Sequence, residues 1–180
     1  MSVIRLAWLL VLFCLPGIGI AGSATGDPQS DDFWYGTAAD GTPTVRLYYF
    51  FSPTCPHCQA AKPFIAELQA RNAWLEVKRY SVKDHRGNAR FYYETAQTLG
   101  AEALSVPGFV FCRQIIIGYD SAATTGKQLA DALQACHDRR AANPAAPDPA
   151  PTVGGASGTA TTPLSAAEEK AGTTVSLPFI

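Results

Sequence analysis

The chain has 180 residues, of which 47% are hydrophobic and 16% charged, and its formal net charge at pH 7 is −1. A chain of this length has room for one ordinary domain with additional terminal segments. Because there is no excess of Lys and Arg to form a basic surface, nucleic acid is not an expected partner.

Residues 1–24 have the pattern of a signal peptide. Arg5 is their only charged residue, an apolar run follows from Leu6 to Leu15, and small residues at 21–24 offer a cleavage site. The run is short for a membrane span, which needs about 20 apolar residues. We therefore expect export to a bacterial periplasm, with an uncleaved N-terminal anchor as the alternative. Residues 25–43 would form a lead-in segment whose aromatic residues at 33–35 pack onto the domain.

A folded domain is predicted for residues 44–140, where hydrophobic patterns alternate with turn signals. The predicted strands are 45–51, 74–82, 108–112 and 114–119, and the predicted helices are 56–71, 89–99 and 124–138. The last two strands are joined too tightly for a crossover, so they should form an antiparallel hairpin. The order predicts an α/β fold with a central mixed four-stranded sheet flanked by helices.

The composition changes after residue 140. Pro, Gly, Ala and Thr dominate 141–172 and cannot build a core, so a disordered or semi-extended linker is expected. The chain ends on the apolar segment 175–180, which we expect to bind back onto the domain or to meet a partner. Residues 141–180 are thus predicted to be a linker and an apolar tail.

Five cysteines are present, and Cys14 would leave with the signal peptide. The remaining four are an even number in an oxidising compartment, which favours two disulfides. Cys112 and Cys136 could form a structural disulfide, remain separate buried thiols, or relay electrons as a second exchange pair. The sequence leaves these three alternatives open.

Cys55 and Cys58 lie three residues apart where an apolar strand meets a helix. Cys55 is therefore expected at the helix N-terminus, where unpaired backbone N–H groups and the helix dipole favour a thiolate. Cys58, one turn later, could close or open a disulfide with it, which is the chemistry of thiol–disulfide exchange. His57 could donate a hydrogen bond to the Cys55 thiolate or place positive charge beside it. The other interpretations are a static disulfide or half of a metal site, which would need two more ligands.

The segment from Phe50 to Cys58 resembles the active-site entry of the thioredoxin superfamily, and its Pro56–His57 dipeptide is the one found in DsbA-type disulfide oxidases. Val106–Pro107 is similar to the cis-proline loop of that superfamily. The resemblance covers about residues 44–138 and implies a thioredoxin fold. It also implies that Val106 and Pro107 face the cysteines, where an extended substrate could pair with the backbone of Val106.

The chain departs from the pattern of this superfamily at two points. Only residues 83–105 lie between the second strand and the Val106–Pro107 loop, which leaves room for one helix and implies a compact domain. Tyr49 stands where the superfamily often has a buried acid that takes the proton of the resolving thiol. A third comparison, of residues 118–127, suggests similarity to exported thioredoxin domains fused to DsbD-like membrane electron carriers.

We therefore expect a periplasmic thiol–disulfide oxidoreductase with Cys55 as nucleophile, Cys58 as resolving thiol, and Pro56 and His57 tuning the pair. The resemblance implies no cofactor and no metal. The expected partners are cysteine-containing exported proteins and a DsbD-like membrane carrier. The direction of electron flow stays open between reductase or isomerase and DsbA-like oxidase. The alternative function is a non-catalytic copper or zinc carrier, or an adaptor that uses the apolar tail.

Overall fold

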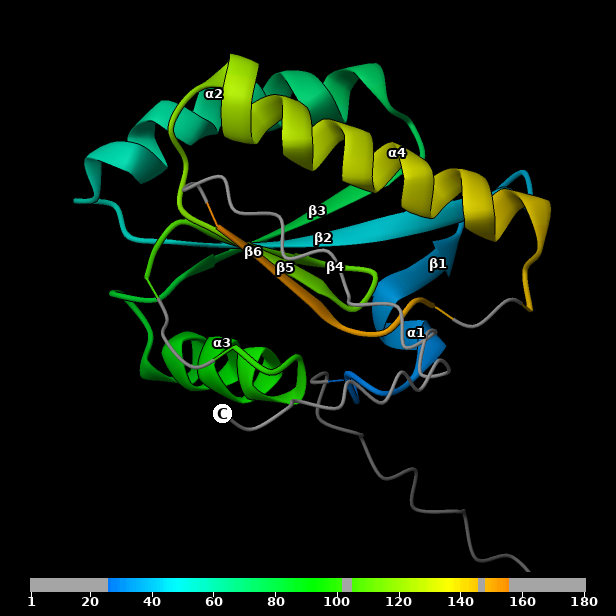
Figure 1. Cartoon of the computed structure of the whole chain (residues 1–180), viewed down its shortest axis with the longest axis horizontal. Helices are drawn as coiled ribbons and strands as arrows, with labels where there is room; N and C mark the ends of the chain where they lie inside the picture. The colour runs from blue at the N-terminus through cyan, green and yellow to red at the C-terminus, as the bar shows by residue number, and fades with distance from the viewer. Residues whose placement is uncertain (1–25, 102–104, 146–147, 156–180) are drawn as a thin grey trace, which may run out of the picture.

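The computed structural model describes residues 26–101, 105–145 and 148–155, which form a mixed sheet with helices on both faces (Figure 1). The expected signal peptide at 1–24 and the apolar tail at 175–180 lie outside the described residues. The elements are α1 (Asp31–Trp34), β1 (Tyr35–Thr37), β2 (Pro43–Phe51), α2 (Pro56–Arg71), β3 (Leu75–Ser81), α3 (Arg86–Thr98), β4 (Gly108–Phe111), β5 (Gln114–Ile117), the π-helix η1 (Ala122–Gly126), α4 (Lys127–Ala142) and β6 (Thr152–Gly155).

Strand β2 is the centre of the sheet. It pairs in parallel with β3 along one edge, from Val45 opposite Leu75 to Phe51 opposite Ser81. The other edge is shared by two antiparallel partners, with β1 at the start of β2 and β4 near its end. Strands β4 and β5 form the tight antiparallel hairpin that the sequence predicts.

The sheet has six strands, so the prediction of four is wrong. The two additional strands are β1, from the expected lead-in segment, and β6, from the expected linker, which pairs in parallel with β5. Each has only three or four residues and no apolar alternation. Such strands form because β2 and β5 present unpaired edge N–H and C=O groups to them, which is a property of the assembled sheet.

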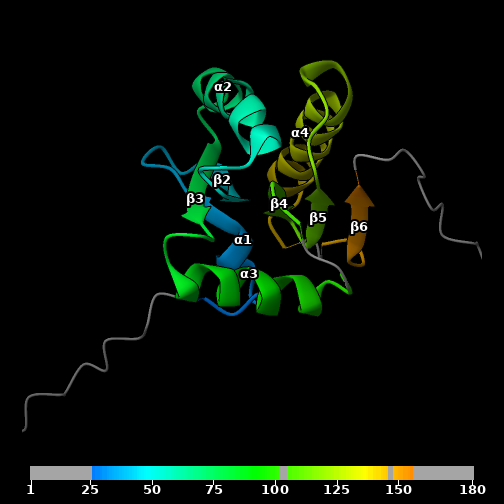
Figure 2. The same ribbon diagram turned by 90° about the vertical axis from the view of Figure 1, so that its left-hand side faces the viewer.

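Two helices cover each face of the sheet. Helices α2 and α4 lie on one face, and α3 and α1 lie on the other (Figures 1 and 2). Because both faces are covered, β2 is a nearly continuous apolar run. Successive side chains of β2 point to opposite faces, so Tyr49 meets α2 while Phe50 stacks on Tyr92 of α3 with ring centroids 4.4 Å apart.

The aromatic residues of the lead-in segment pack onto the domain, as predicted. Phe33, Trp34 and Tyr35 are buried, and Phe33 stacks on Tyr48 at a centroid distance of 4.5 Å. The Tyr48 hydroxyl also donates a hydrogen bond to the Phe33 carbonyl at 2.7 Å. These contacts hold the segment before β2 against the α3 face.

Candidate thiol–disulfide site

Cys55 caps the N-terminus of α2. Its backbone is extended (φ −84°, ψ 120°), Pro56 follows in the first turn, and the Cys58 backbone N–H points at the Cys55 sulfur with N and Sγ 3.4 Å apart. Pro56 fits here because the first helical position needs no N–H donor. The cap geometry and the helix dipole both favour negative charge on Cys55, which is partly exposed and open to a substrate disulfide.

Cys58 lies one turn into α2 on its buried face, which it shares with Ala61 and Ile65. Its side chain has no solvent exposure. Burial, with a further contribution from the hydrogen bond to Cys55, raises the pKa of the Cys58 thiol well above its usual range. Both cysteines are free thiols in this structure. The pair therefore combines an accessible sulfur with a buried one.

The loop before β4 faces the cysteines, as the resemblance predicts. The Val106–Pro107 peptide bond is cis, and the Cys55 thiol donates to the Val106 carbonyl with Sγ and O 3.4 Å apart. Gly118, just after β5, donates its N–H to the Pro107 carbonyl at 2.8 Å. Backbone groups of residues 106–107 thus lie directly beside the reactive sulfur.

The Nδ1 atom of His57 contacts a residue other than Cys55. Its Nδ1 lies 2.8 Å from the carbonyl oxygen of Tyr119. Because a carbonyl can only accept, Nδ1 carries the proton in this contact. In this dithiol arrangement His57 therefore connects the start of α2 to the segment after β5, and its Nδ1–H is not available to the Cys55 sulfur.

Tyr49 lies at the position where the resemblance would place a buried acid. It is 1% exposed, and its hydroxyl donates to the Cys58 carbonyl with the two oxygens 2.9 Å apart. Burial raises the pKa of Tyr49 further above its ordinary value. The phenol therefore fixes the backbone of the CxxC turn and stays protonated at neutral pH.

The loop around Pro107 is supported by Tyr92 and Gly108, which sequence reasoning did not select. The Tyr92 hydroxyl donates to the Ser105 carbonyl at 3.0 Å. A Cβ atom at Gly108 would lie 2.1 Å from the Tyr92 hydroxyl oxygen, so only glycine leaves room for this ring. The sequence marked Tyr92 as a core residue and nothing more. Tyr119 could not be found from its residue type either, because it contacts His57 through its backbone carbonyl.

Cys112 and Cys136 form a disulfide. Both are fully buried, and the bond joins the turn between β4 and β5 to helix α4. The two cysteines are thus paired with each other in this structure rather than present as separate thiols. The Tyr35 hydroxyl lies 3.3 Å from the Cys136 sulfur and also donates to Asp148, so β1 and the segment before β6 meet at this bond.

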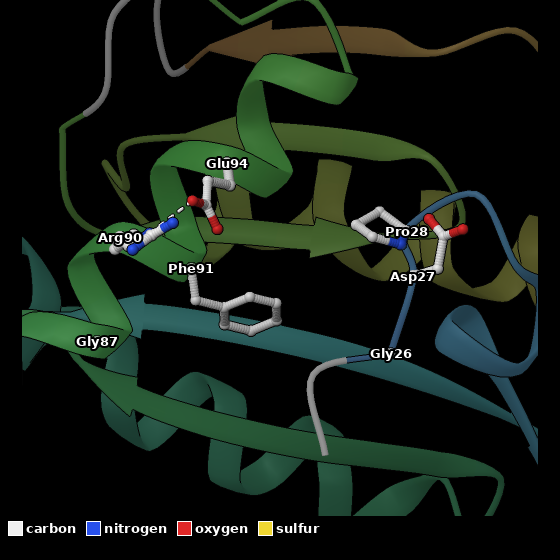
Figure 3. Close-up of a pocket in the computed structure, with 7 residues that line it drawn as sticks. All are labelled: Gly26, Asp27, Pro28, Gly87, Arg90, Phe91 and Glu94. Atoms are coloured by element: carbon white, nitrogen blue, oxygen red, sulfur yellow. Dashed lines mark hydrogen bonds and ion pairs between the residues drawn. The ribbon is translucent and has the colours of Figure 1, made fainter. Parts of the chain in front are cut away.

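The described residues include two surface hollows of interest here. One, of about 370 Å³, opens between α2 and the segment after β5 and is lined by Ala60, Pro63, Phe64, Glu67, Tyr119, Asp120, Ser121 and Ala122. The other, of about 470 Å³, lies between the lead-in segment and α3. Figure 3 shows Phe91 on its wall beside the Arg90–Glu94 ion pair, which is 2.6 Å long. The first of these two hollows adjoins the cysteine site through Tyr119, whose carbonyl contacts His57.

Two further observations concern metals and membranes. Within residues 26–101, 105–145 and 148–155, three or more His, Cys, Asp or Glu side chains do not gather where they could hold a metal ion. In the same part of the chain, the helices are too short or too polar to cross a membrane.

Comparison with known proteins gave no assignment: no family model matches this chain, and a search of curated proteins found none with significant similarity.

Proposed function

We propose that the protein is an exported thiol–disulfide oxidoreductase with a thioredoxin-type domain. The observation that carries the proposal is the juxtaposition of Cys55, at the N-cap of α2, with the Val106 carbonyl, 3.4 Å from its sulfur. A thiolate in this position is accessible, and the neighbouring backbone can hold an extended peptide whose disulfide lies over Cys55. The proposed substrates are cysteine-containing exported proteins, with a DsbD-like membrane carrier as electron partner in the periplasm.

The proposed reaction proceeds in two exchanges. The Cys55 thiolate attacks a substrate disulfide, forming a mixed disulfide and releasing one substrate thiolate. Cys58 then loses its proton and attacks the Cys55 sulfur, which closes the Cys55–Cys58 disulfide and releases the second substrate thiolate. Two electrons pass from the protein to the substrate. The reverse sequence oxidises a substrate dithiol.

The test is a titration of the protein against glutathione buffers, with mass spectrometry to identify the cysteines that change state. We expect Cys55 and Cys58 to titrate as one two-electron couple while Cys112–Cys136 stays oxidised. A potential near about −270 mV would favour a reductant, and one between about −120 and −180 mV a disulfide donor or isomerase.

The Cys55→Ser variant should abolish the couple, while Arg86→Ser, a surface control in the first turn of α3, should leave it unchanged. If the Cys55–Cys58 pair does not titrate at all, the oxidoreductase proposal is wrong. The metal-carrier alternative would then be tested by elemental analysis of protein purified in the reduced state.

A further inference from the structure

The cysteine site lies between two loops of opposite charge. Strands β2, β3 and β5 run in the same direction, so the residues that follow them meet at one edge of the sheet. Cys55 follows β2. The segments after β3 and β5 lie on opposite sides of it, because β3 pairs with one edge of β2 while β5 lies beyond β4 on the other (Figure 2). A substrate segment that crosses Cys55 would therefore meet both loops.

The flank after β3 carries a cation next to the reactive cysteine. The exposed Lys83 ammonium donates to the hydroxyl of Thr54, with Nζ and Oγ1 3.5 Å apart. Thr54 directly precedes Cys55 in the chain. The neighbouring Asp84 carboxylate is turned back onto β3, where it accepts from the Ser81 hydroxyl at 2.7 Å. The positive charge of Lys83 is therefore the one that a substrate would meet on this flank.

The flank after β5 carries an anion. The hollow of about 370 Å³ between α2 and this segment is lined by the carboxylates of Glu67 and Asp120, and the described residues that line it include no Lys, Arg or His. Glu67 forms an ion pair with Arg71, one turn later in α2. Asp120 is exposed and accepts from the Thr124 hydroxyl at 2.7 Å, which leaves its charge in place. Asp120 is therefore the counterpart of Lys83 on this flank.

The walls of the hollow suit a long side chain with a charged end. Pro63 and Phe64 give it an apolar surface, and Tyr119 joins it to the cysteine site, since the Tyr119 carbonyl contacts His57. The aliphatic stem of a lysine or arginine can lie on such a wall while its charged head reaches Asp120. An acidic side chain in the same place would be repelled by that carboxylate.

Building on the proposed function, we propose that Lys83 and Asp120 determine substrate specificity, so that the site prefers a reactive cysteine with a carboxylate on one side and a lysine or arginine on the other. The Val106 backbone, whose carbonyl lies 3.4 Å from the Cys55 sulfur, gives the substrate segment one direction across the site. In the preferred order the carboxylate meets Lys83 and the cation meets Asp120. In the opposite order both contacts are repulsive.

The test compares two peptides of the same composition, each with one cysteine held as a mixed disulfide with thionitrobenzoate. One peptide has Asp before the cysteine and Lys after it, and the other has the reverse order. The Cys55 thiolate attacks the peptide sulfur and releases the coloured thionitrobenzoate anion, so the initial rate of release reports this attack. Because the peptides have equal net charge, the ratio of their rates does not depend on the nucleophilicity of Cys55. We expect a ratio of about five or more at about 0.05 M salt, and below about two at about 0.5 M salt.

Charge-reversed variants identify the residues that set this ratio. Lys83→Glu/Asp120→Lys keeps the net charge of the protein and should make the other peptide the faster one. Arg90→Glu/Glu94→Lys swaps an exposed ion pair on α3, so it is the matched control and should keep the wild-type ratio. If the first double variant does not fold, Lys83→Gln and Asp120→Asn should each lower the ratio about twofold.

The outcomes separate this specificity from the proposed function. Equal rates for the two peptides in the wild-type protein would refute the specificity and leave the oxidoreductase proposal standing. The same holds for a ratio that the substitutions at Lys83 and Asp120 leave unchanged, or that the control on α3 changes equally. If neither peptide forms a disulfide with Cys55, both proposals are refuted.

Discussion

Removal of the Cys112–Cys136 disulfide should lower the stability of the protein by an amount that the structure allows one to estimate. The bond closes a loop with a sequence separation of 24 residues. In the chain-entropy model, a loop of this size restricts the unfolded chain by about 3.5 kcal/mol at room temperature. In Cys112→Ala/Cys136→Ala, loss of the two buried sulfur atoms should add about 1 kcal/mol each, by analogy with a buried methylene.

The assay is urea unfolding followed by tryptophan fluorescence, in the Cys55→Ser background so that only one intramolecular disulfide can form. Adding a reductant to this protein isolates the cross-link and should lower the free energy of unfolding by about 3.5 kcal/mol. The Ala/Ala variant should lose about 5.5 kcal/mol in total. A change of less than about 1 kcal/mol on reduction would contradict the loop-closure argument.

Three further predictions concern stability. Gly108→Ala should cost about 3 kcal/mol or more in urea unfolding, because its Cβ would lie 2.1 Å from the Tyr92 hydroxyl oxygen. Adding Tyr92→Leu should recover part of that loss. If the effects of the two substitutions on the free energy of unfolding simply add, the clash is not the cause. Arg113→Gly should raise the free energy of unfolding by about 1 kcal/mol, since Arg113 has φ 59° in the two-residue turn between β4 and β5. An unchanged or lower urea midpoint would count against strain at this residue. Above about pH 10, stability should fall as the pH rises, because unfolded phenols release protons that the buried ones retain. Absorbance titration of tyrosinate at 295 nm, beside unfolding curves at several pH values, would check this, and tyrosines that all ionise near pH 10 in the folded protein would refute it. The tyrosines whose pKa burial raises are Tyr35, Tyr48, Tyr49, Tyr92 and Tyr119.

The sequence alone determined the elements that carry their own pattern. The apolar run of β2, predicted as 45–51, is observed as Pro43–Phe51, and α2 has the predicted bounds Pro56–Arg71. A strand that is buried on both faces and a helix that begins at a Pro are local signals, so they can be read without knowing the fold. The position of Cys55 at the N-cap follows from the same signals.

Tertiary structure alone decided which segments and side chains meet. The strands β1 and β6 have no pattern of their own, and they exist because β2 and β5 have edges to complete. His57 donates to Tyr119 rather than to Cys55 because the segment after β5 brings a carbonyl within 2.8 Å of its ring. The sequence indicated that Cys58 follows Cys55 by one turn, but only the folded structure shows that the Cys58 side chain is fully buried. Spacing along the chain fixes the order of the reactive groups, whereas burial, which sets the ease of proton loss, is a property of the whole fold.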